Sequence, residues 1–337
     1  MATIKDVARV AGVGLGTASR VISGNGSVAP ATVARVKAAI AQLGFRPSHT
    51  ARALLSGMSH MIGVYIPILK GTFYTPLLRL VDTELRENGQ HMVGAFGSGS
   101  GNARKQAREG IEFLADRGCD GILVLSNALR DEDMTGIREL ARPIALVNHS
   151  LPSLPEQSFV VDHAQGGRLA AQTLLEAGHR RIALVGGPGY APDNTVRVNA
   201  FLSELSAAGI PRSRVPRMNA DFSPEGGRAA AEVLLKRPLT CSAVFCANDE
   251  MAVGVLSYCQ QAGIAVPAEL SVMGYDDVES AAYTAPQLTT VHMPWREVTL
   301  DAVRWLLNTC YQTELPLSRK YEVSVMYRRS VSAPAFS

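Results

Sequence analysis

The stretch TIKDVARVAGVGLGTASRVI, residues 3–22, contains two short helical patterns separated by a tight turn. Thr3 stands three residues before Asp6, which is the spacing of a capping box, so a first helix is predicted to begin there. Gly12 is predicted to end this helix, because glycine adopts a left-handed backbone conformation at little cost. A second helix is predicted from Leu15 to Ile22 on the spacing of its apolar residues.

A third helix is predicted after the break at SGNGSV, residues 23–28. Pro30 suits a first-turn position, and Gly44 lies past the end of the pattern. Apolar residues recur between them at helical spacing, namely at Val33, Val36, Ile40 and Leu43. Three short helices joined by tight turns are typical of a helix-turn-helix, whose second helix presents its N-terminal half to the major groove of DNA. Residues 1–47 are therefore predicted to form a small all-α DNA-binding head.

The charge of the chain is unevenly distributed. Residues 1–57 contain seven Lys and Arg but a single acidic residue, Asp6, and carry a net charge of +6. The remaining residues contain 26 basic and 29 acidic side chains, a balance of −3. A small basic unit ahead of a mildly acidic body indicates a polyanion-binding head on a body with another task. A merely solvated basic face is the alternative interpretation.

Residues 48–60 are predicted to form a hinge helix and linker. The residues His49–Leu55 favour a helix, Ser48 can cap it, and Gly57 ends it. A helix this short rarely persists alone in water, so we expect it to fold only when it is docked against something else.

From Met61 onward, short apolar runs alternate with amphipathic helical stretches. The strand-like runs are MIGVYIPIL, HMVGAF, GILVLS, PIALVN, FVVD, RIALVGGP, SAVFCAN and LSVMGYD. The helical stretches are Tyr74–Asn88, Arg104–Arg117, Gln165–Ala177, Val196–Ala208, Pro224–Leu235 and Glu250–Ala262. Such alternation is typical of parallel sheets covered by helices on both faces.

The length of this pattern predicts an α/β core of two doubly wound parallel-sheet lobes, because a single hydrophobic core stops growing beyond about 250–300 residues. We expect the chain to pass between the lobes near Phe159–His163. The expected lobes comprise residues 61–161 plus 292–320 and residues 162–291 plus 321–332. Ligands of such sheets bind at the carboxyl ends of the strands, which can face each other across a cleft.

Several functional classes are disfavoured by the sequence. No apolar run is long enough to span a membrane, and the N-terminus lacks the apolar stretch of a secretion signal. Five cysteines without CxxC spacing indicate reduced thiols in a cytoplasmic protein. Histidines at ligand spacing, a phosphate loop and a nucleophile elbow are all lacking, so no metal, cofactor or enzyme activity is predicted. Asp276 and Asp277 adjoin on a predicted strand and point to opposite sides, so they cannot form a catalytic pair, and Asp277 is interpreted as a structural carboxylate.

The motifs taken together resemble one known family. The segments TIKDVARVAGVGLGTASRVI, RPSHTARALLSG, RIALVGGP, CANDEMAVG, VPAELSVMGYDD, PQLTTV and RRSV occur in the order found in the lactose/galactose repressor (LacI/GalR) family of bacterial transcription regulators. The resemblance runs essentially from end to end. It implies a helix-turn-helix head, a hinge helix that DNA orders, and a two-lobed core like that of periplasmic sugar-binding proteins.

The resemblance also implies which residues of the head contact DNA. Leu15 and Gly16 match the positions that touch base edges, although neither can make a bidentate hydrogen bond to a base. Thr17 and Ser19 carry hydroxyls suited to phosphates, and Arg20 can reach a phosphate or a guanine. Leu54 matches the position that wedges into the minor groove, where it would unstack one base step; read without the family, Leu54 and Leu55 would be a buried pair. The predicted DNA-binding set is Thr3, Leu15, Gly16, Thr17, Ser19, Arg20, Asn25 and Leu54.

A second set of residues matches the effector-contacting positions of the family. Asn148, Asn248 and Asp276 end predicted strands, and Arg197 lies near the start of a predicted helix. Polar groups of these kinds can pair with the hydroxyls of a sugar, and an aromatic wall can cover its apolar side. Phe73, Phe222 and Trp295 match such walls, with ordinary core packing as the alternative for Phe222 and Trp295. The predicted ligand-binding set is Phe73, Asn148, Arg197, Phe222, Asn248, Asp276 and Trp295.

These observations predict a cytoplasmic, sequence-specific regulator, a repressor, controlled by a small carbohydrate-like effector bound between the lobes. Its partners would be a pseudo-palindromic double-stranded operator and a second copy of the chain, because two hinge helices are needed to fill the groove. A dimer is expected rather than a tetramer, since no leucine heptads follow RRSVS. The alternatives are a sugar-binding protein of a transport system and a sugar-modifying enzyme. A nucleobase could also satisfy Arg197, Asn248 and Asp276.

Overall fold

The computed structural model describes residues 2–23, 27–45 and 57–335. The first two ranges form the head, which contains α1 (Ile4–Ala11), α2 (Leu15–Ser23) and α3 (Pro30–Leu43). The predicted capping box is present at the start of α1, and Gly12 ends the helix with a φ of 64°. A small core of its own holds the head together, made of Val7, Ala11, Val36 and Ala39. Asn25, Leu54 and the hinge helix predicted at 49–55 lie outside the described residues.

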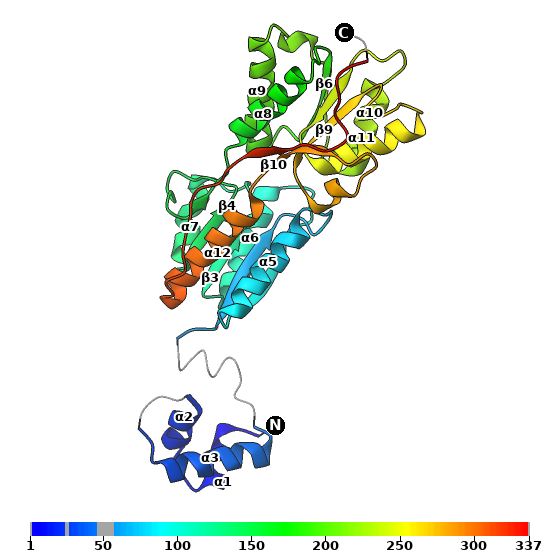
Figure 1. Cartoon of the computed structure of the whole chain (residues 1–337). Helices are drawn as coiled ribbons and strands as arrows, with labels where there is room; N and C mark the ends of the chain where they lie inside the picture. Colours follow the sequence, from blue (N-terminus) through cyan, green and yellow to red (C-terminus); the bar gives the residue numbers. More distant parts are fainter. Residues whose placement is uncertain (1, 24–26, 46–56, 336–337) are drawn as a thin grey trace.

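The N-terminal lobe is built on a five-stranded parallel sheet with the order β2-β1-β3-β4-β5. The strands are β1 (Met61–Ile66), β2 (His91–Phe96), β3 (Gly121–Val124), β4 (Ile144–Val147) and β5 (Ser158–Phe159). The α-helices of this lobe are α5 (Tyr74–Glu87), α6 (Ala103–Asp116), α7 (Met134–Glu139) and α12 (Trp295–Tyr311). Although α12 comes late in the chain, it packs beside α5 and against β3 and β4 (Figure 1).

The C-terminal lobe is built on a six-stranded sheet with the order β11-β10-β9-β8-β6-β7. All neighbouring strands are parallel except the β10–β11 pair. The strands are β6 (Ile182–Gly186), β7 (Arg217–Asn219), β8 (Ala243–Cys246), β9 (Ser271–Asp276), β10 (Thr289–His292) and β11 (Ser324–Met326). Its helices are α8 (His163–Glu176), α9 (Pro192–Ala207), α10 (Pro224–Leu234) and α11 (Asp249–Gln261). Short 3-10 helices lie at Asp131–Asp133, Arg212–Arg214 and Glu279–Ala282.

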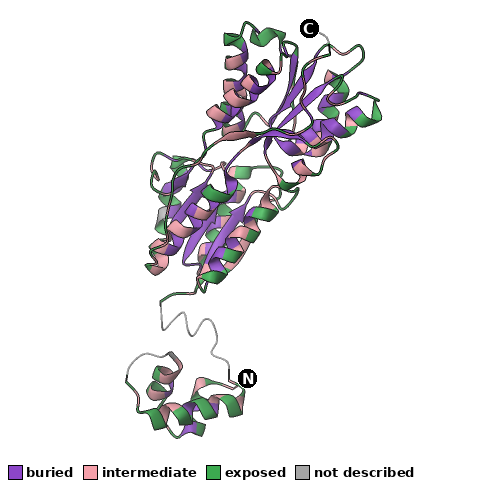
Figure 2. Ribbon diagram, viewed as in Figure 1, coloured by how far each residue is buried: buried purple, intermediate pink, exposed green. Residues whose placement is uncertain are grey.

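The chain passes between the lobes three times, after β5, after β10 and after α12 (Figure 1). The central strands β3, β4, β6, β8 and β9 are buried along their whole length, while the outer faces of the helices are exposed (Figure 2). Continuous apolar strands buried on both faces are what a parallel sheet between two helical layers requires. The expected α/β core of two doubly wound lobes is therefore confirmed.

Some elements differ from the sequence-based expectation. The sequence pattern did not predict α7, α12, β7, β10 or β11, of which the three-residue strands β7 and β11 are only partly buried and lack a clear apolar run. The helix expected at Val196–Ala208 begins at Pro192, since proline fits the first turn of a helix. This earlier start places Asp193 one turn before Arg197.

Candidate functional site

The second helix of the head presents an accessible surface. Among the predicted DNA contacts, Leu15, Gly16 and Arg20 are exposed, while Thr17 and Ser19 are half-buried. Ala18 is fully buried against the rest of the head and fixes which side of α2 faces outward. Nearly half of the Leu15 surface, 47%, is exposed, so its side chain is accessible to a partner.

The start of α2 is formed by Gly14. Its carbonyl accepts hydrogen bonds from the backbone N–H of Thr17 at 2.9 Å and of Ala18 at 3.0 Å. The Nε of Arg20 donates to the carbonyl of Gly16 at 3.3 Å, so the guanidinium group lies along the exposed side of the helix. These contacts leave the N-terminal half of α2 open to a partner.

Thr3 already has a structural role at the start of α1. Its hydroxyl donates to Asp6 at 2.7 Å, and the hydrogen bonds from Thr3 lower the pKa of the Asp6 carboxyl to about 2. The exposed cations of the described part of the head are Lys5, Arg9, Arg20, Arg35 and Lys37.

A cavity of about 350 Å³ lies where the two lobes meet. Its walls come from the ends of β3 and β4, from the crossover after β5, and from the first turns of α8 and α9. The lining residues are Asn127, Asn148, His149, Ser150, Val160, Val161, Asp162, His163, Ala164, Pro192, Asp193 and Val196. This is the place at which doubly wound sheets bind ligands.

Asp193 connects the two lobes across this cavity. Asn127 of the N-terminal lobe donates its Nδ2 to Asp193 Oδ1 at 2.7 Å, and Asn148 donates to Oδ2 at 3.5 Å. On its own helix, the same carboxylate accepts from the guanidinium of Arg197 at 2.9 Å. The Asp193 carboxylate thus contacts side chains of both lobes at the cavity wall.

Arg197 is buried beneath the cavity, with 2% of its surface exposed. Its guanidinium donates to the carbonyl of Ala247 and lies 4.0 Å from the centre of the Tyr275 ring. Its ion-pair partner is Asp193. Because the guanidinium is removed from water and an unpaired buried charge is costly, this ion pair is needed to hold Arg197 in the interior.

His163 carries no charge in this site. Burial and the nearby Arg197 lower the pKa of its imidazole to about 3. Its Nδ1 lies 2.9 Å from the hydroxyl of Tyr275 and 3.4 Å from the guanidinium of Arg197, and its Nε2 lies 2.6 Å from Asn148 Oδ1. Because the guanidinium can only donate, the neutral tautomer with the proton on Nε2 satisfies all three contacts.

Asp276, Trp295 and Phe73 form a second group next to His163. The indole of Trp295 donates to Asp276 at 3.2 Å, and its ring lies 5.2 Å from the Phe73 ring and 5.9 Å from the His163 ring. Burial raises the pKa of Asp276 to about 7, against the opposing effects of Arg197 and of the indole hydrogen bond. An aromatic wall beside a buried carboxyl suits the apolar face and hydroxyls of a sugar.

Asn248 and Phe222 are connected to each other rather than to the cavity. The side chain of Asn248 caps α11 by accepting from Met251 N at 2.9 Å, and its amide donates to the Phe222 carbonyl at 3.0 Å. Phe222 is half-buried and packs against the C-terminal lobe. Both side chains therefore have structural contacts, and their place in ligand binding stays a prediction.

Three of the predicted ligand-binding residues have a strained backbone. The φ angles are 59° at Asn148, 66° at Phe222 and 107° at Asp276, a region that favours glycine. Non-glycine residues in such conformations cluster at functional sites, where the surrounding structure holds them in place.

Contacts with His163 therefore bring together Asn148, Arg197 and Trp295, and through Trp295 also Asp276 and Phe73. Asn148 is the member of the predicted set that lines the described cavity. Sequence reasoning missed His163, Asp193, Tyr275 and Asn127. The spacing of Asp193 and Arg197, four residues apart on one helix, could have indicated their pairing.

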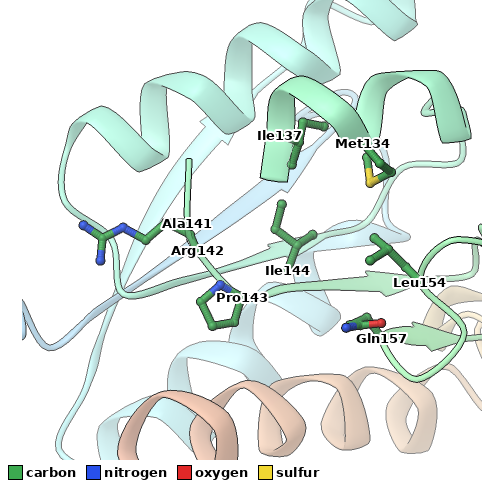
Figure 3. Close-up of a pocket in the computed structure, with 8 residues that line it drawn as sticks. All are labelled: Met134, Ile137, Ala141, Arg142, Pro143, Ile144, Leu154 and Gln157. Atoms are coloured by element: carbon green, nitrogen blue, oxygen red, sulfur yellow. The ribbon is translucent and has the colours of Figure 1, made fainter. Parts of the chain in front are cut away.

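A second cavity, of about 280 Å³, lies in the N-terminal lobe between α7 and the start of β4 (Figure 3). Its lining is mostly apolar, with side chains that face one another from Met134, Ile137, Ile144 and Leu154. The polar side chains of the lining are those of Arg142 and Gln157. It lacks the convergent polar groups of the interlobe cavity, so we do not assign the effector to it.

Among the described residues, no helix is long and apolar enough to cross a membrane. The same residues contain no group of three His, Cys, Asp or Glu side chains that could hold a metal ion.

Comparisons with known proteins agree with this architecture. A family model described as bacterial regulatory proteins, lacI family, matches residues 3–48, and one described as a periplasmic binding protein-like domain matches residues 171–331. The ribose operon repressor of Escherichia coli is 33% identical over 330 residues, which cover 98% of this chain and 99% of that protein.

Two solved structures extend the likeness to the full chain. The lac repressor dimer bound to operator and the anti-inducer ONPF matches with a TM-score of 0.84 at 26% identity, covering 98% of this chain and 99% of that one. The regulator CelR in complex with cellobiose matches with a TM-score of 0.69 at 31% identity, covering 98% of this chain and 100% of that one.

The matches include the DNA-binding head as well as the core, so they give no support to the alternative of a transport protein. The relatives are transcriptional regulators and not enzymes, in agreement with the sequence analysis. This chain belongs to the LacI family and is a DNA-binding transcriptional regulator, with a helix-turn-helix head and a periplasmic-binding-protein-like core.

Proposed function

We propose that this chain binds a pseudo-palindromic operator as a homodimer in the cytoplasm, represses transcription there, and changes its DNA affinity when a small carbohydrate occupies the interlobe cavity. The similarity to a lac repressor dimer on its operator and to a regulator complexed with cellobiose supports both halves of this proposal. The described head adds its own support, because α2 exposes residues of the kinds that contact bases and phosphates.

The proposed DNA contacts are of three kinds, with base edges, with phosphates and within the minor groove. Leu15 and Gly16 face base edges, where Leu15 can contact a thymine methyl group and Gly16 permits close approach of the backbone. Leu54 wedges into the minor groove. The residues proposed to hold phosphates are Thr3, Thr17, Ser19, Arg20 and Asn25, of which Arg20 can also reach a guanine.

The proposed effector site combines the side chains that surround His163 with Asn248 and Phe222. Asn148, Arg197, Asn248 and Asp276 supply polar partners, and Phe73, Phe222 and Trp295 supply apolar walls. The proposed lobes are residues 61–161 plus 292–320 and residues 162–291 plus 321–332. They follow a head at 1–47 and a hinge at 48–60.

The observation that carries the regulatory mechanism is the bridge from Asn127 and Asn148 through Asp193 to Arg197. A sugar whose hydroxyls replace or extend these contacts changes how the lobes are held together. In a dimer, lobe movement alters the separation of the two linkers and thereby biases whether the hinge helices form. A coupling free energy of about 1–3 kcal/mol corresponds to roughly 5- to 150-fold regulation.

The proposal is tested by selecting DNA from a randomised library with the full chain and then screening sugars by thermal shift. We expect an enriched sequence with two-fold symmetry, and at least one sugar that raises the melting temperature, because ligand at 100 times its Kd stabilises the fold by about 2.7 kcal/mol. Recovery of DNA without any shared sequence would contradict specific operator binding. Stabilisation by nucleobases alone would contradict a carbohydrate effector.

A further inference from the structure

The charges around the interlobe cavity are mostly negative. Asp162 and Asp193 line the cavity, and the Asp276 carboxyl, whose pKa burial raises to about 7, accepts from the indole of Trp295 in the group next to His163. Glu250 at the start of α11 reaches across to the N-terminal lobe, where it accepts hydrogen bonds from both the backbone N–H and the hydroxyl of Thr72. The cationic side chain buried with them is Arg197, and His163 is neutral.

The guanidinium of Arg197 is already occupied on most of its donors. One terminal nitrogen donates to the Ala247 carbonyl, and the other lies between Asp193 Oδ2 at 2.9 Å and His163 Nδ1 at 3.4 Å. The face of the guanidinium lies over Tyr275. Its Nε is buried and is without a hydrogen-bond partner. A carboxylate or phosphate needs two parallel N–H groups for the bidentate pairing that makes arginine a strong anion ligand. Of the five N–H groups of this guanidinium two are left, the Nε–H and one on the nitrogen that donates to Ala247, and these two do not lie on the same edge of the group.

The remaining cations near the cavity are directed elsewhere. Lys70 is exposed and lies 3.8 Å from Glu225 of the other lobe, and Arg168 is turned toward Gln165 and Asp162. An anionic ligand entering this space would meet the carboxylate of Asp193 without a free cation among the described residues lining the cavity. A neutral sugar, by contrast, can donate its hydroxyls to Asp193 and Asp276 and accept from the amides of Asn127 and Asn148.

We infer that the effector is an electroneutral carbohydrate, that phosphorylated and carboxylated sugars are excluded, and that Asp193 is the residue that excludes them. This inference rests on the proposed function, since it narrows the chemistry of the same site. Asp193 excludes anions in two ways. It holds the guanidinium of Arg197, and it places its own negative charge on the cavity wall.

The test compares sugars in matched pairs by calorimetry and thermal shift with the full chain. The pairs are ribose with ribose 5-phosphate, glucose with glucose 6-phosphate, and galactose with galacturonate, together with neutral cellobiose. We expect stabilisation by at least one neutral member and an affinity about 100-fold or more lower for its anionic counterpart, given the cost of bringing like charges close in a partly desolvated site.

The variant Asp193→Asn tests the cause. It keeps the size and an acceptor oxygen for Asn127, but it removes the negative charge and frees the guanidinium of Arg197. We expect the preference for the neutral member of a pair to shrink by at least about tenfold in this variant. The matched control is Asp116→Asn, which removes the same charge from the exposed end of α6 and should leave the preference unchanged. Wild-type melting curves alone decide the first part of the inference if Asp193→Asn does not fold.

The outcomes separate this inference from the proposed function. Stabilisation of the wild type by anionic members alone would overturn the inference and leave a carbohydrate effector intact. A preference unchanged by Asp193→Asn would overturn the role of Asp193. No stabilisation by any member of the panel, neutral or anionic, would contradict the carbohydrate effector itself and with it the inference.

Discussion

Asp276 and Asp277 are neighbours in the chain, yet they occupy opposite electrostatic environments. Burial raises the pKa of Asp276 to about 7. Burial also acts to raise the pKa of Asp277, but hydrogen bonds from His292 at 2.9 Å and Arg328 at 2.6 Å outweigh it and hold that pKa below its ordinary value. Asp276 is the last residue of β9 and Asp277 follows the strand, both with a positive φ, so the two side chains are not directed by the regular alternation of a strand. The local turn leaves Asp276 with the Trp295 indole, while Asp277 fastens the end of β9 to β10 and the C-terminal segment.

The folded chain retains a proton on Asp276 at pH values where the unfolded chain has released it. Since the pKa rises from 3.8 to about 7 on folding, this residue lowers the free energy of unfolding as the pH rises through that window. The variant Asp276→Asn lacks this dependence. Relative to the wild type, it should gain roughly 1–3 kcal/mol of stability between about pH 5 and pH 8 in urea unfolding.

Asp277→Asn is the matched control. In the wild type the pKa of Asp277 is lowered on folding. Its carboxylate therefore stabilises the fold at every pH above the ordinary aspartate pKa of 3.8, and this effect is lost only in stronger acid. The control variant should therefore lose similar stability at both pH values. Identical pH profiles for the wild type and Asp276→Asn would show that burial does not retain the proton.

Among individual residues, the sequence predicted part of the candidate site. The ends of apolar strands directed attention to Asn148 and Asp276, and the resemblance directed it to Arg197 and Trp295. His163 could not be found in the same way, because it acquires its partners from other segments of the chain, and the contact of Asp193 with Asn127 is equally non-local. The pairing of Asp193 with Arg197, one turn away on α9, is the part of the site that helical spacing alone could have indicated. The capping role of Asn248 was also hidden, since an asparagine after a strand fits both a ligand contact and a helix cap.

Among the elements, α2 combines an exposed leucine, Leu15, with a reverse side on which Ala18 is fully buried. Truncating Leu15 to alanine removes surface that contacts nothing in the core, so stability should change by less than about 0.5 kcal/mol. If Leu15 touches a thymine methyl group, operator affinity should fall by about 1 kcal/mol, or roughly fivefold. Fluorescence anisotropy at several salt concentrations should show an unchanged salt slope, because no phosphate contact is lost.

The exposed Val10 on α1 provides the comparison for Leu15, since it is 39% exposed and is not a predicted DNA contact. Val10→Ala should leave operator affinity unaltered. Equal effects of the two truncations would mean that α2 does not read the bases.

The start of β1 is fastened by Asp120, directly after the linker. Its carboxylate accepts from the backbone N–H groups of Ser59 and His60 at 2.9 and 2.8 Å, and from the Tyr311 hydroxyl at 2.8 Å. The His60 ring also stacks on Tyr311 at 5.7 Å. This clamp fixes the point from which the linker leaves the core, so it should transmit lobe movement to the hinge.

Tyr311→Phe tests the clamp by removing one of its hydrogen bonds. We expect a loss of about 1 kcal/mol in the free energy of unfolding. Operator affinity should fall several-fold while the affinity for a neutral sugar stays constant, as measured by anisotropy and calorimetry. A looser linker must lose more conformational freedom on DNA, which is the physical reason for the drop.

Tyr321→Phe is a close control for this variant. The Tyr321 hydroxyl donates to Asp301 at 2.9 Å, and Asp301 also accepts from two backbone N–H groups, those of Ser318 and Arg319. This second tyrosine–aspartate arrangement does not hold the residues before β1. A drop in operator affinity of the same size in both variants would assign the effect to general destabilisation.

The elements that the sequence predicted well are those with capping residues at their ends or with a continuous apolar run. The Thr3–Asp6 spacing and Gly12 predicted the two ends of α1. The apolar runs GILV and AVFC form β3 and β8, which are buried on both faces of their sheets. The elements it missed depend on tertiary contacts. The strand β11 exists as an antiparallel partner of β10, and α12 is recognisable only when its packing on α5 and β4 is known.

For the whole molecule, the arrangement of the two lobes depends on contacts at their facing edges. Glu250 accepts from Thr72 N at 2.5 Å and from its hydroxyl at 2.9 Å. Gly71 makes this approach possible, because a Cβ at that position would lie 2.4 Å from the Glu250 carboxylate and its φ is +76°. Together with the Asn127–Asp193 bond, this latch holds the two lobes at a defined separation.

Glu250→Ala should open the latch and make closure around a ligand less favourable. Hydrogen bonds to charged groups contribute about 1.5–3 kcal/mol when shielded, and solvent at this exposed contact reduces that to roughly 1 kcal/mol. We therefore expect about fivefold weaker binding of a neutral sugar and a larger radius of gyration in X-ray scattering.

Glu225→Ala is the matched control, because it removes another carboxylate that pairs across the lobes, one that is 76% exposed and lies 3.8 Å from Lys70. Solvent screens this pair, so sugar affinity should stay at the wild-type value. Weakening by Glu225→Ala but not by Glu250→Ala would contradict the latch.

The central claim is that a ligand between the lobes controls how firmly the head holds DNA. It is tested most directly by the anisotropy of a labelled operator titrated with the full chain, with and without a sugar that raises its melting temperature. We expect the sugar to change operator affinity by roughly 5- to 150-fold and to leave the affinity for a DNA of scrambled sequence unchanged. An operator affinity that stays the same while the sugar saturates the core would contradict it.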